Sequence, residues 1–237
     1  MSEAEGKAGA EGVLRIFAPV PGATRIVLIR HGEAVCNVEG VVGGKLGCKG
    51  LTDQGRRQVA ALADRLKSSE ELREATALYS SVLPRAVETA ELLRDVIGVD
   101  GARLDLEQQC ELCELHPGES DNMTWQEVID TFGVPDWSVD ETRPIAPGGE
   151  SWASFRPRAA AAVRALAQGH PGEVVVAVVH AGVIESTMIE FLRIPPAVYK
   201  RGWLRIPHAS MTTWEWVPSE RRWVLVRFSD AYGVPIA

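Results

Sequence analysis

A short apolar run that ends in Arg-His-Gly constrains this chain more than any other stretch. Residues 26–29 read Ile-Val-Leu-Ile, and residues of this kind favour a short, buried strand. Gly32 permits a tight turn directly afterwards. Arg30 and His31 are therefore expected at the carboxyl end of a central strand, which is where ligands bind in open α/β sheets.

The residue types at this turn suit phosphate chemistry. An imidazole nitrogen can attack phosphorus and carry a phosphoryl group covalently. A neighbouring guanidinium can bind phosphate oxygens through two parallel hydrogen bonds. The tripeptide Arg30-His31-Gly32 also arises by chance in chains rich in Arg and Gly, so the rest of the sequence has to decide between the two interpretations.

Two further strands are expected to end in polar turns. Residues 76–80 lead to Pro84, which suits the first turn of a helix, and to Arg85. Residues 173–179 form the strongest buried strand, and His180 follows it directly. The simplest geometry brings four side chains around one anion at this edge of the sheet, in a phosphoryl-transfer site that needs no metal. These are Arg30, His31, Arg85 and His180.

The remaining pattern alternates helices with short strands. Helices are predicted by capping residues and by apolar side chains three or four positions apart. The expected helices begin at Thr52, Pro84, Trp125, Glu150 and Val183. The remaining expected strands lie near residues 111–115 and, as a C-terminal hairpin, at residues 210–217 and 223–228. Residues 135–149 are rich in Pro, Gly and Asp and are expected to form a loop.

Composition limits the function classes. The net charge of −7 argues against a nucleic-acid surface, although a local arginine cluster can still bind a small anion. No apolar run approaches the roughly 18 residues that span a membrane, and the acidic N-terminus lacks the features of a signal peptide. We therefore expect a cytoplasmic protein with no membrane or nucleic-acid partner, a flexible tail over residues 1–22 and a single catalytic domain over residues 23–237.

Cys110 and Cys113 form an isolated C-x-x-C among the four cysteines. A zinc site would need two more ligands at a comparable spacing, and none is evident from the sequence. Buried or incidental cysteines are the simpler interpretation, and a functional thiol pair is the alternative. No carboxylate cluster suggests Mg²⁺ or a dinuclear site, so neither a metal nor a cofactor is expected.

Six pieces of the chain form an ordered set between about residue 25 and residue 230. They are residues 28–33 with Asn37, Leu51-Thr52 with Gly55, residues 80–86 with 88–90, residues 112–114, residues 147–151 and residues 178–184. In this order they resemble the histidine phosphatase superfamily, also called the phosphoglycerate-mutase-like family. Each piece alone is weak, whereas the ordered set is highly specific.

The resemblance implies a fold and a set of roles. The fold is a three-layer α/β/α arrangement with a mainly parallel central sheet, one antiparallel edge strand and a small cap formed by insertions. His31 would be the nucleophile that becomes phosphohistidine, and Glu114 would protonate the leaving oxygen and then activate water. The residues that would hold the phosphate are Arg30, Asn37, Arg85 and His180.

Three positions of this sequence bear on how closely it follows the family. Glu114 is preferred over Glu111 and Glu119 as the acid, because its Leu-x-Glu setting matches that of the family. Ala181 stands where a second glycine is common. His208 stands where many members carry an asparagine, so it is expected to shape the pocket.

Hydrolysis is preferred over transfer to a second hydroxyl group. Cofactor-dependent mutases of this family carry a Trp-containing loop after the nucleophile and a longer insertion after the acid, whereas residues 40–50 hold no Trp and residues 116–149 form only a modest insertion. We expect a metal-independent phosphomonoester hydrolase that acts on a small phosphorylated metabolite. The alternatives are a cofactor-dependent mutase and a catalytically silent phospholigand-binding module, which the retained nucleophile and acid disfavour.

The sequence leaves the substrate and the oligomeric state open, although members of this family are often homodimers. Loop residues that could rim the pocket are Lys45, Lys49, His116, Trp125 and Arg143.

Overall fold

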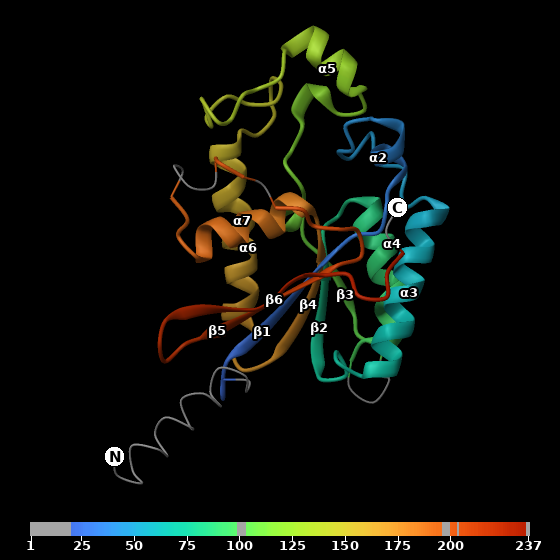
Figure 1. Ribbon diagram of the computed structural model, residues 1–237, viewed down its shortest axis with the longest axis vertical. Coiled ribbons are helices and arrows are strands. Elements are labelled where there is room, and N and C mark those ends of the chain that lie inside the picture. Colours follow the sequence, from blue (N-terminus) through green and yellow to red (C-terminus); the bar gives the residue numbers. More distant parts are fainter. Residues whose placement is uncertain (1–19, 99–102, 196–199, 203, 236–237) are drawn as a thin grey trace.

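The computed structural model describes residues 20–98, 103–195, 200–202 and 204–235, so most of the expected tail lies outside the described residues. Its centre is a six-stranded sheet of order β3-β2-β4-β1-β5-β6 (Figure 1). The strands are β1 (Thr24–Arg30), β2 (Ala75–Ser80), β3 (Leu106–Gln108), β4 (Val174–Val179), β5 (Met211–Val217) and β6 (Arg222–Asp230).

The four strands from β3 to β1 are parallel, and β5 runs against β1. The hairpin partner β6 is antiparallel to β5 and therefore runs in the direction of β1. The predicted mainly parallel α/β fold is thus confirmed. The strand that runs in the opposite direction is β5, which lies next to the edge strand β6.

Helices cover both faces of the sheet (Figure 1). Ile26 and Leu28 of β1 pack on one side with α6 (Trp152–Gly169) and α7 (Ala181–Phe191). Val27 and Ile29 pack on the other side with α3 (Asp53–Ser69) and α4 (Pro84–Leu93). Because both faces are buried, β1 is a continuous apolar run rather than an alternating one, as the sequence indicated.

Shorter helices account for much of the remaining chain. They are α2 (Val35–Glu39), η1 (Arg94–Val96), η3 (Cys110–Leu112), η4 (Gly118–Ser120) and α5 (Trp125–Phe132), where η denotes a 3₁₀ helix. Figure 1 shows α2 and α5 beyond the carboxyl ends of the central strands. Among the described residues, no helix combines the length and the apolar character needed to cross a bilayer.

The strand expected near residues 111–115 is wrong. The third strand lies earlier, at Leu106–Gln108, and Cys110–Leu112 form a 3₁₀ turn instead. The carbonyl oxygens of Glu111 and Cys113 accept hydrogen bonds from Arg158 Nη1 on α6, at 2.9 and 3.2 Å. A guanidinium on a helix thus satisfies the backbone groups that a neighbouring strand would otherwise have paired.

The predicted cap at Thr52 is confirmed, and Ser151 caps the other long helix. Thr52 accepts a hydrogen bond from the Gly55 amide at 2.9 Å and caps α3, while Ser151 caps α6 through the Ser154 amide. Gly55 also permits a close approach, because a Cβ there would lie 2.1 Å from the Glu33 carbonyl oxygen. The start of α3 therefore packs directly against the turn that follows β1.

Candidate active site

The four side chains predicted to surround an anion meet at the carboxyl edge of the sheet. Arg30 ends β1 and His31 follows it, while Arg85 lies in the first turn of α4 and His180 between β4 and α7. The rings of His31 and His180 are 5.1 Å apart, and Arg85 Nε lies 3.1 Å from His31 Nε2.

The hydrogen bonds of His31 define its tautomer. Its Nδ1 lies 2.6 Å from the Gly32 carbonyl oxygen, which can only accept, so the proton is on Nδ1. Its Nε2 accepts a hydrogen bond from Arg85 Nε. The lone pair of the neutral ring is therefore on Nε2, on the side that faces the guanidinium.

Both buried imidazoles are held in the neutral form. Burial, followed by the charge of Arg85, lowers the pKa of His31 and that of His180 well below the ordinary value of 6.5. His31 is 3% exposed and His180 is fully buried. A neutral imidazole at His31 is what nucleophilic attack requires at neutral pH.

A serine links His180 to the cysteine segment. Ser81 Oγ lies 2.8 Å from His180 Nε2 and 3.4 Å from Cys113 Sγ, to which it donates. His180 Nδ1 is buried and has no hydrogen-bond partner within the described ranges. That nitrogen remains available to a ligand.

Arg30 is a second unsatisfied group of the site. Its Nη1 donates to the Ile206 carbonyl oxygen, whereas its buried Nε has no partner among the residues that the structure describes. Burial lowers the pKa of Arg30 to about 10, with the charge of Glu114 opposing that shift and the charge of Arg85 adding to it. The guanidinium remains a cation at neutral pH with a free donor.

A Gly-rich loop packs against Arg85. Arg85 Nη1 donates to the Gly43 carbonyl oxygen at 2.7 Å. The carboxylate of Asp121 holds the same loop by accepting hydrogen bonds from the amides of Gly44, Leu46 and Gly47 at 2.9 to 3.0 Å. The loop therefore orients the guanidinium that contacts His31.

Glu114 is the predicted acid that the structure brings into the pocket. Its carboxylate accepts from the Gly182 amide at 3.0 Å, at the start of α7, and from the Leu115 amide at 3.2 Å. A Cβ at position 182 would lie 2.2 Å from Glu114 Oε1, which explains a glycine there. Glu111 and Glu119 are exposed and do not line this pocket.

Asn37 and His208 complete the surroundings of His31. Asn37 lines the pocket, and because its Oδ1 accepts from the Ala34 amide at 3.1 Å, its amide NH₂ is the group that can donate to a ligand. The ring of His208 lies 5.6 Å from that of His31. Burial, then the charges of Arg30 and Arg85, lowers the pKa of His208 to about 3, so this third imidazole is also neutral.

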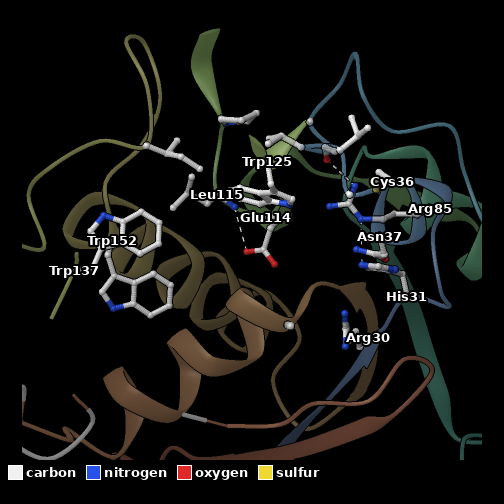
Figure 2. Close-up of a pocket in the computed structure, with 18 residues that line it drawn as sticks. Arg30, His31, Cys36, Asn37, Arg85, Glu114, Leu115, Trp125, Trp137 and Trp152 are labelled. Carbon is white, nitrogen blue, oxygen red and sulfur yellow. Dashed lines mark hydrogen bonds between the residues drawn. The ribbon is translucent and has the colours of Figure 1, made fainter. Parts of the chain in front are cut away.

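The pocket has a volume of about 360 Å³ and two unlike ends. Figure 2 shows His31, Asn37 and Arg85 on one side and Trp137 and Trp152 on the other, with Glu114 between them in this view. Those two indole rings stack with centroids 5.9 Å apart. The other apolar side chains of the lining are Val41, Val42, Leu115, Pro117, Trp125, Ile145 and Ala181.

Only one of the five candidate rim residues lines the main pocket. Trp125 lines the main pocket, whereas Lys45 and His116 line a smaller neighbouring cavity. Lys49 pairs with Glu39, and Arg143 donates to the Phe132 carbonyl oxygen, so neither lines the main pocket.

The sequence pieces that carry the family resemblance also support the backbone around the site. Thr89 Oγ1 accepts from the Gly32 amide at 3.1 Å, and Glu88 accepts from the Leu51 amide at 2.8 Å. Glu150 accepts from Arg158 and from the His116 amide, at 2.6 and 2.9 Å. These contacts fix the backbone around His31 and around Glu114.

Sequence reasoning missed two polar residues that lie beside the site. Ser81 belongs to the quoted piece 80–86, but no role followed from its position beside His180. Glu185 lies on α7, where burial and then the charge of Glu114 raise its pKa to about 7. Glu185 lies one helical turn after Ala181, and this spacing could have indicated that it faces the same side of the helix.

Comparison with known proteins agrees with this geometry. The family model described as histidine phosphatase superfamily (branch 1) matches residues 26–231. Phosphoglycerate mutase-like protein 4 of Arabidopsis thaliana is 34% identical over 164 residues, which are 68% of each chain. A metal-independent phosphoserine phosphatase of the same plant is 31% identical over 179 residues, 73% of this chain and 70% of the other.

Solved structures show the same fold. The YhfR protein of Bacillus stearothermophilus has a TM-score of 0.75 and 27% identity, covering 90% of this chain and all of that one. A mycobacterial glucosyl-3-phosphoglycerate phosphatase in complex with VO3 has a TM-score of 0.68 and 27% identity, covering 86% and 98%. The sheet, the paired histidines and the matched length together place the chain in the histidine phosphatase superfamily, branch 1, as a phosphatase.

Proposed function

We propose that this protein hydrolyses small phosphomonoesters without a metal, through a phosphohistidine on His31. The observation that carries the proposal is the tautomer of His31. Its Nδ1 donates to the Gly32 carbonyl oxygen, which leaves a neutral ring with its lone pair on the buried Nε2. Nε2 is therefore the proposed nucleophilic atom.

Donors around Nε2 support a phosphate position beside it. Arg30 Nε is a buried donor without a partner in the described chain, and His180 Nδ1 is also buried without one; such groups cost free energy unless a ligand satisfies them. When the Ser81 hydroxyl turns from Cys113 to donate to His180 Nε2, the histidine proton lies on Nδ1 and can be donated to a phosphate oxygen. Arg85 and Asn37 supply further donors. We propose that these four residues bind the phosphate oxygens and that the two guanidinium groups offset the charge that develops on them.

The leaving group is proposed to depart toward Glu114. In the first step the His31 Nε2–P bond forms and the ester O–P bond breaks, while Glu114 gives its proton to the departing oxygen. In the second step Glu114 takes a proton from water, the water oxygen bonds to phosphorus and the N–P bond breaks. Inorganic phosphate leaves, and the acid and the imidazole are restored.

The pocket lining favours water over a second phosphorylated substrate as the acceptor. Among the described lining residues, Arg30 and Arg85 are the only arginines or lysines, and both lie at the phosphate end. Beyond them the walls are formed by indole and aliphatic side chains. A mutase that uses bisphosphoglycerate would need cations for a second phosphate and for a carboxylate. The apolar walls instead suit an uncharged leaving group.

The site is assembled from residues as far apart as Arg30 and His208, which supports one catalytic domain over residues 23–237.

Three assays distinguish the candidate functions. Steady release of phosphate from p-nitrophenyl phosphate, unchanged by EDTA, is expected for a metal-independent hydrolase. Isomerisation of monophosphoglycerate that depends on bisphosphoglycerate would instead indicate a mutase, and neither activity would indicate a binding module. A panel of phosphorylated metabolites would then identify the preferred leaving group, which we expect to be apolar and uncharged.

A further inference from the structure

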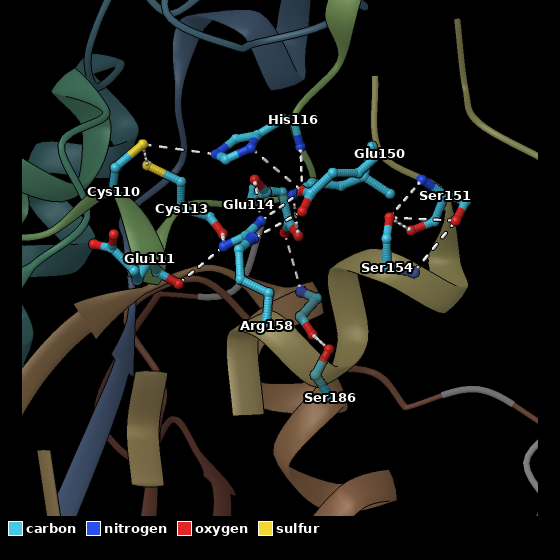
Figure 3. Close-up of polar contacts among 12 residues, drawn as sticks. Cys110, Glu111, Cys113, Glu114, His116, Glu150, Ser151, Ser154, Arg158 and Ser186 are labelled. Carbon is cyan, nitrogen blue, oxygen red and sulfur yellow. Dashed lines mark hydrogen bonds and ion pairs between the residues drawn. The ribbon is translucent and has the colours of Figure 1, made fainter. Parts of the chain in front are cut away.

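Cys110, Cys113 and His116 form a cluster outside the phosphate pocket (Figure 3). Cys110 Sγ lies 3.7 Å from Cys113 Sγ and 3.6 Å from His116 Nε2. All three atoms lie within 4.8 Å of one another. The spacing is C-x-x-C-x-x-H, so the sequence prediction that no further ligand accompanies the cysteine pair overlooked His116.

Two of the three separations between these atoms fit a tetrahedral metal centre. Zinc binds thiolate sulfur at about 2.3 Å and imidazole nitrogen at about 2.0–2.1 Å, so a tetrahedral angle places two sulfurs about 3.8 Å apart and a sulfur and a nitrogen about 3.6 Å apart. The two Cys110 separations match these edge lengths.

The orientation of His116 fits the same role. Its Nε2 faces the sulfur atoms, while its Nδ1 lies 3.6 Å from Glu150 Oε2. Glu150 is fixed in place because it accepts from the His116 amide at 2.9 Å and from Arg158 at 2.6 Å. A carboxylate behind the second ring nitrogen is the usual support of a histidine that binds zinc through the first.

A cavity of about 210 Å³ lies against all three side chains, and it has room for a water molecule as the fourth ligand. We propose that Cys110, Cys113 and His116 bind one zinc ion, with the fourth position open to water from this cavity. Binding converts the two thiols to thiolates and releases two protons to solvent.

This site would hold the segment that carries Glu114. Cys113 and His116 flank Glu114 in sequence, so a shared metal ion would fix the backbone on both sides of it. The phosphoryl chemistry at His31 does not pass through the metal. The Glu114 carboxylate is itself held by the Gly182 and Leu115 amides, so hydrolysis is expected to persist when the metal is removed.

Titration of the reduced, chelator-treated full-length protein with Co²⁺ tests the proposal. We expect one equivalent to give the sulfur-to-cobalt and visible absorption bands of a tetrahedral thiolate centre, and Zn²⁺ to displace them. Cys110→Ser and His116→Ala should each weaken binding at least about a hundredfold, and Glu150→Gln about tenfold. Cys36→Ser with Cys48→Ser is the matched control and should bind like the wild type, because neither cysteine belongs to the cluster or lines its cavity.

Circular dichroism of each variant shows whether it folds, and the half-buried Cys110 is the substitution that disturbs packing least. The proposal is overturned if the reduced protein gives no such bands, or if Cys110→Ser binds Co²⁺ like the wild type. It is also overturned if Cys110 and Cys113 form a disulfide that persists under the reducing conditions of the titration. Binding is read by absorbance alone, so loss of phosphatase activity in chelator would contradict the proposed function and not this site.

Discussion

The two ends of the pocket are built in different ways. At the phosphate end, His31, Arg85 and His180 follow strands of the central sheet and are at most 5% exposed. At the leaving-group end, Glu114 and the tryptophans come from loops and helix starts, and Trp125 is 48% exposed. Figure 2 shows His31 and Arg85 on one side and Trp137 and Trp152 on the other, with Glu114 and Trp125 between them.

This difference suggests that one end binds the phosphate group and that the other end selects the leaving group. Residues at the ends of packed strands are held by the core, so a buried phosphate site can be kept rigid with its donors already in place. Side chains on an insertion can change without disturbing the sheet. We therefore expect substitutions at the first end to affect all substrates equally, and those at the second end to depend on the leaving group.

The largest leaving-group dependence is expected at Glu114. General acid catalysis contributes about 10²–10⁴-fold, so Glu114→Gln should reduce kcat/KM, which reports the phosphorylation step, on alkyl phosphates by about that factor. p-Nitrophenyl phosphate should lose far less, because its leaving group needs little protonation. Steady-state kinetics on both substrates measures this, with Glu111→Gln as the control. If Glu111→Gln shows the pattern and Glu114→Gln does not, the acid is misassigned.

Arg85 is expected to show the opposite behaviour, with a loss that is independent of the leaving group. Charge-assisted hydrogen bonds contribute about 1.5–3 kcal/mol each, so Arg85→Ala should reduce kcat/KM at least about tenfold for every substrate. Arg85→Lys should restore only part of this, because a point charge cannot replace two parallel donors. Near-normal kcat/KM in Arg85→Ala would remove the residue from the phosphate site.

Trp125 should affect selectivity without affecting chemistry. Aromatic contacts contribute about 0.5–1.5 kcal/mol, so Trp125→Ala should raise KM for naphthyl phosphate about fivefold and leave KM for glycerol phosphate nearly unchanged. Ile129→Ala is the matched control, since Ile129 lies on the same helix, is 44% exposed and does not line the pocket. Equal changes for both substrates would contradict an apolar leaving-group end.

The buried histidines also predict a pH dependence of stability. The pKa of His180 is lowered from 6.5 in the folded state, so below about pH 6.5 the unfolded chain binds the additional proton. Above about pH 6.5, His180 adds no pH dependence to the free energy of unfolding. Below that pH, His180 lowers the free energy of unfolding by up to about 1.4 kcal/mol per pH unit. We therefore measure the free energy of unfolding by denaturant at about pH 7.5 and about pH 5.5. Its decrease between these two pH values should be about 1.4 kcal/mol smaller for His180→Asn than for the wild type. Equal drops would mean that His180 is protonated in the folded protein.

The phosphate end could be predicted from the sequence because its residues follow strongly patterned strands. Short apolar runs located β1, β2 and β4, and the parallel arrangement then brought Arg30, Arg85 and His180 to His31. Gly32 marked the turn, although its contact with the start of α3 became visible only in the structure.

The other end depends on contacts between distant segments that no local pattern contains. The short apolar pieces between Leu104 and Leu115 suggest a strand near residues 111–115, but Arg158 on α6 donates hydrogen bonds to the carbonyl groups there. His116 was considered only as a rim residue, because its proximity to Cys110 requires the turn at η3. Trp137 and Trp152 were not predicted to face the pocket, since their stacking follows from the loop between them.

Trapping the phosphorylated enzyme tests the central claim most directly. Brief mixing with labelled substrate, followed by an alkaline quench, preserves a phosphorus–nitrogen bond that acid would hydrolyse. The account predicts label on a peptide that contains His31, and loss of both label and turnover in a folded His31→Ala variant. Label on a serine, or full turnover in His31→Ala, would contradict it.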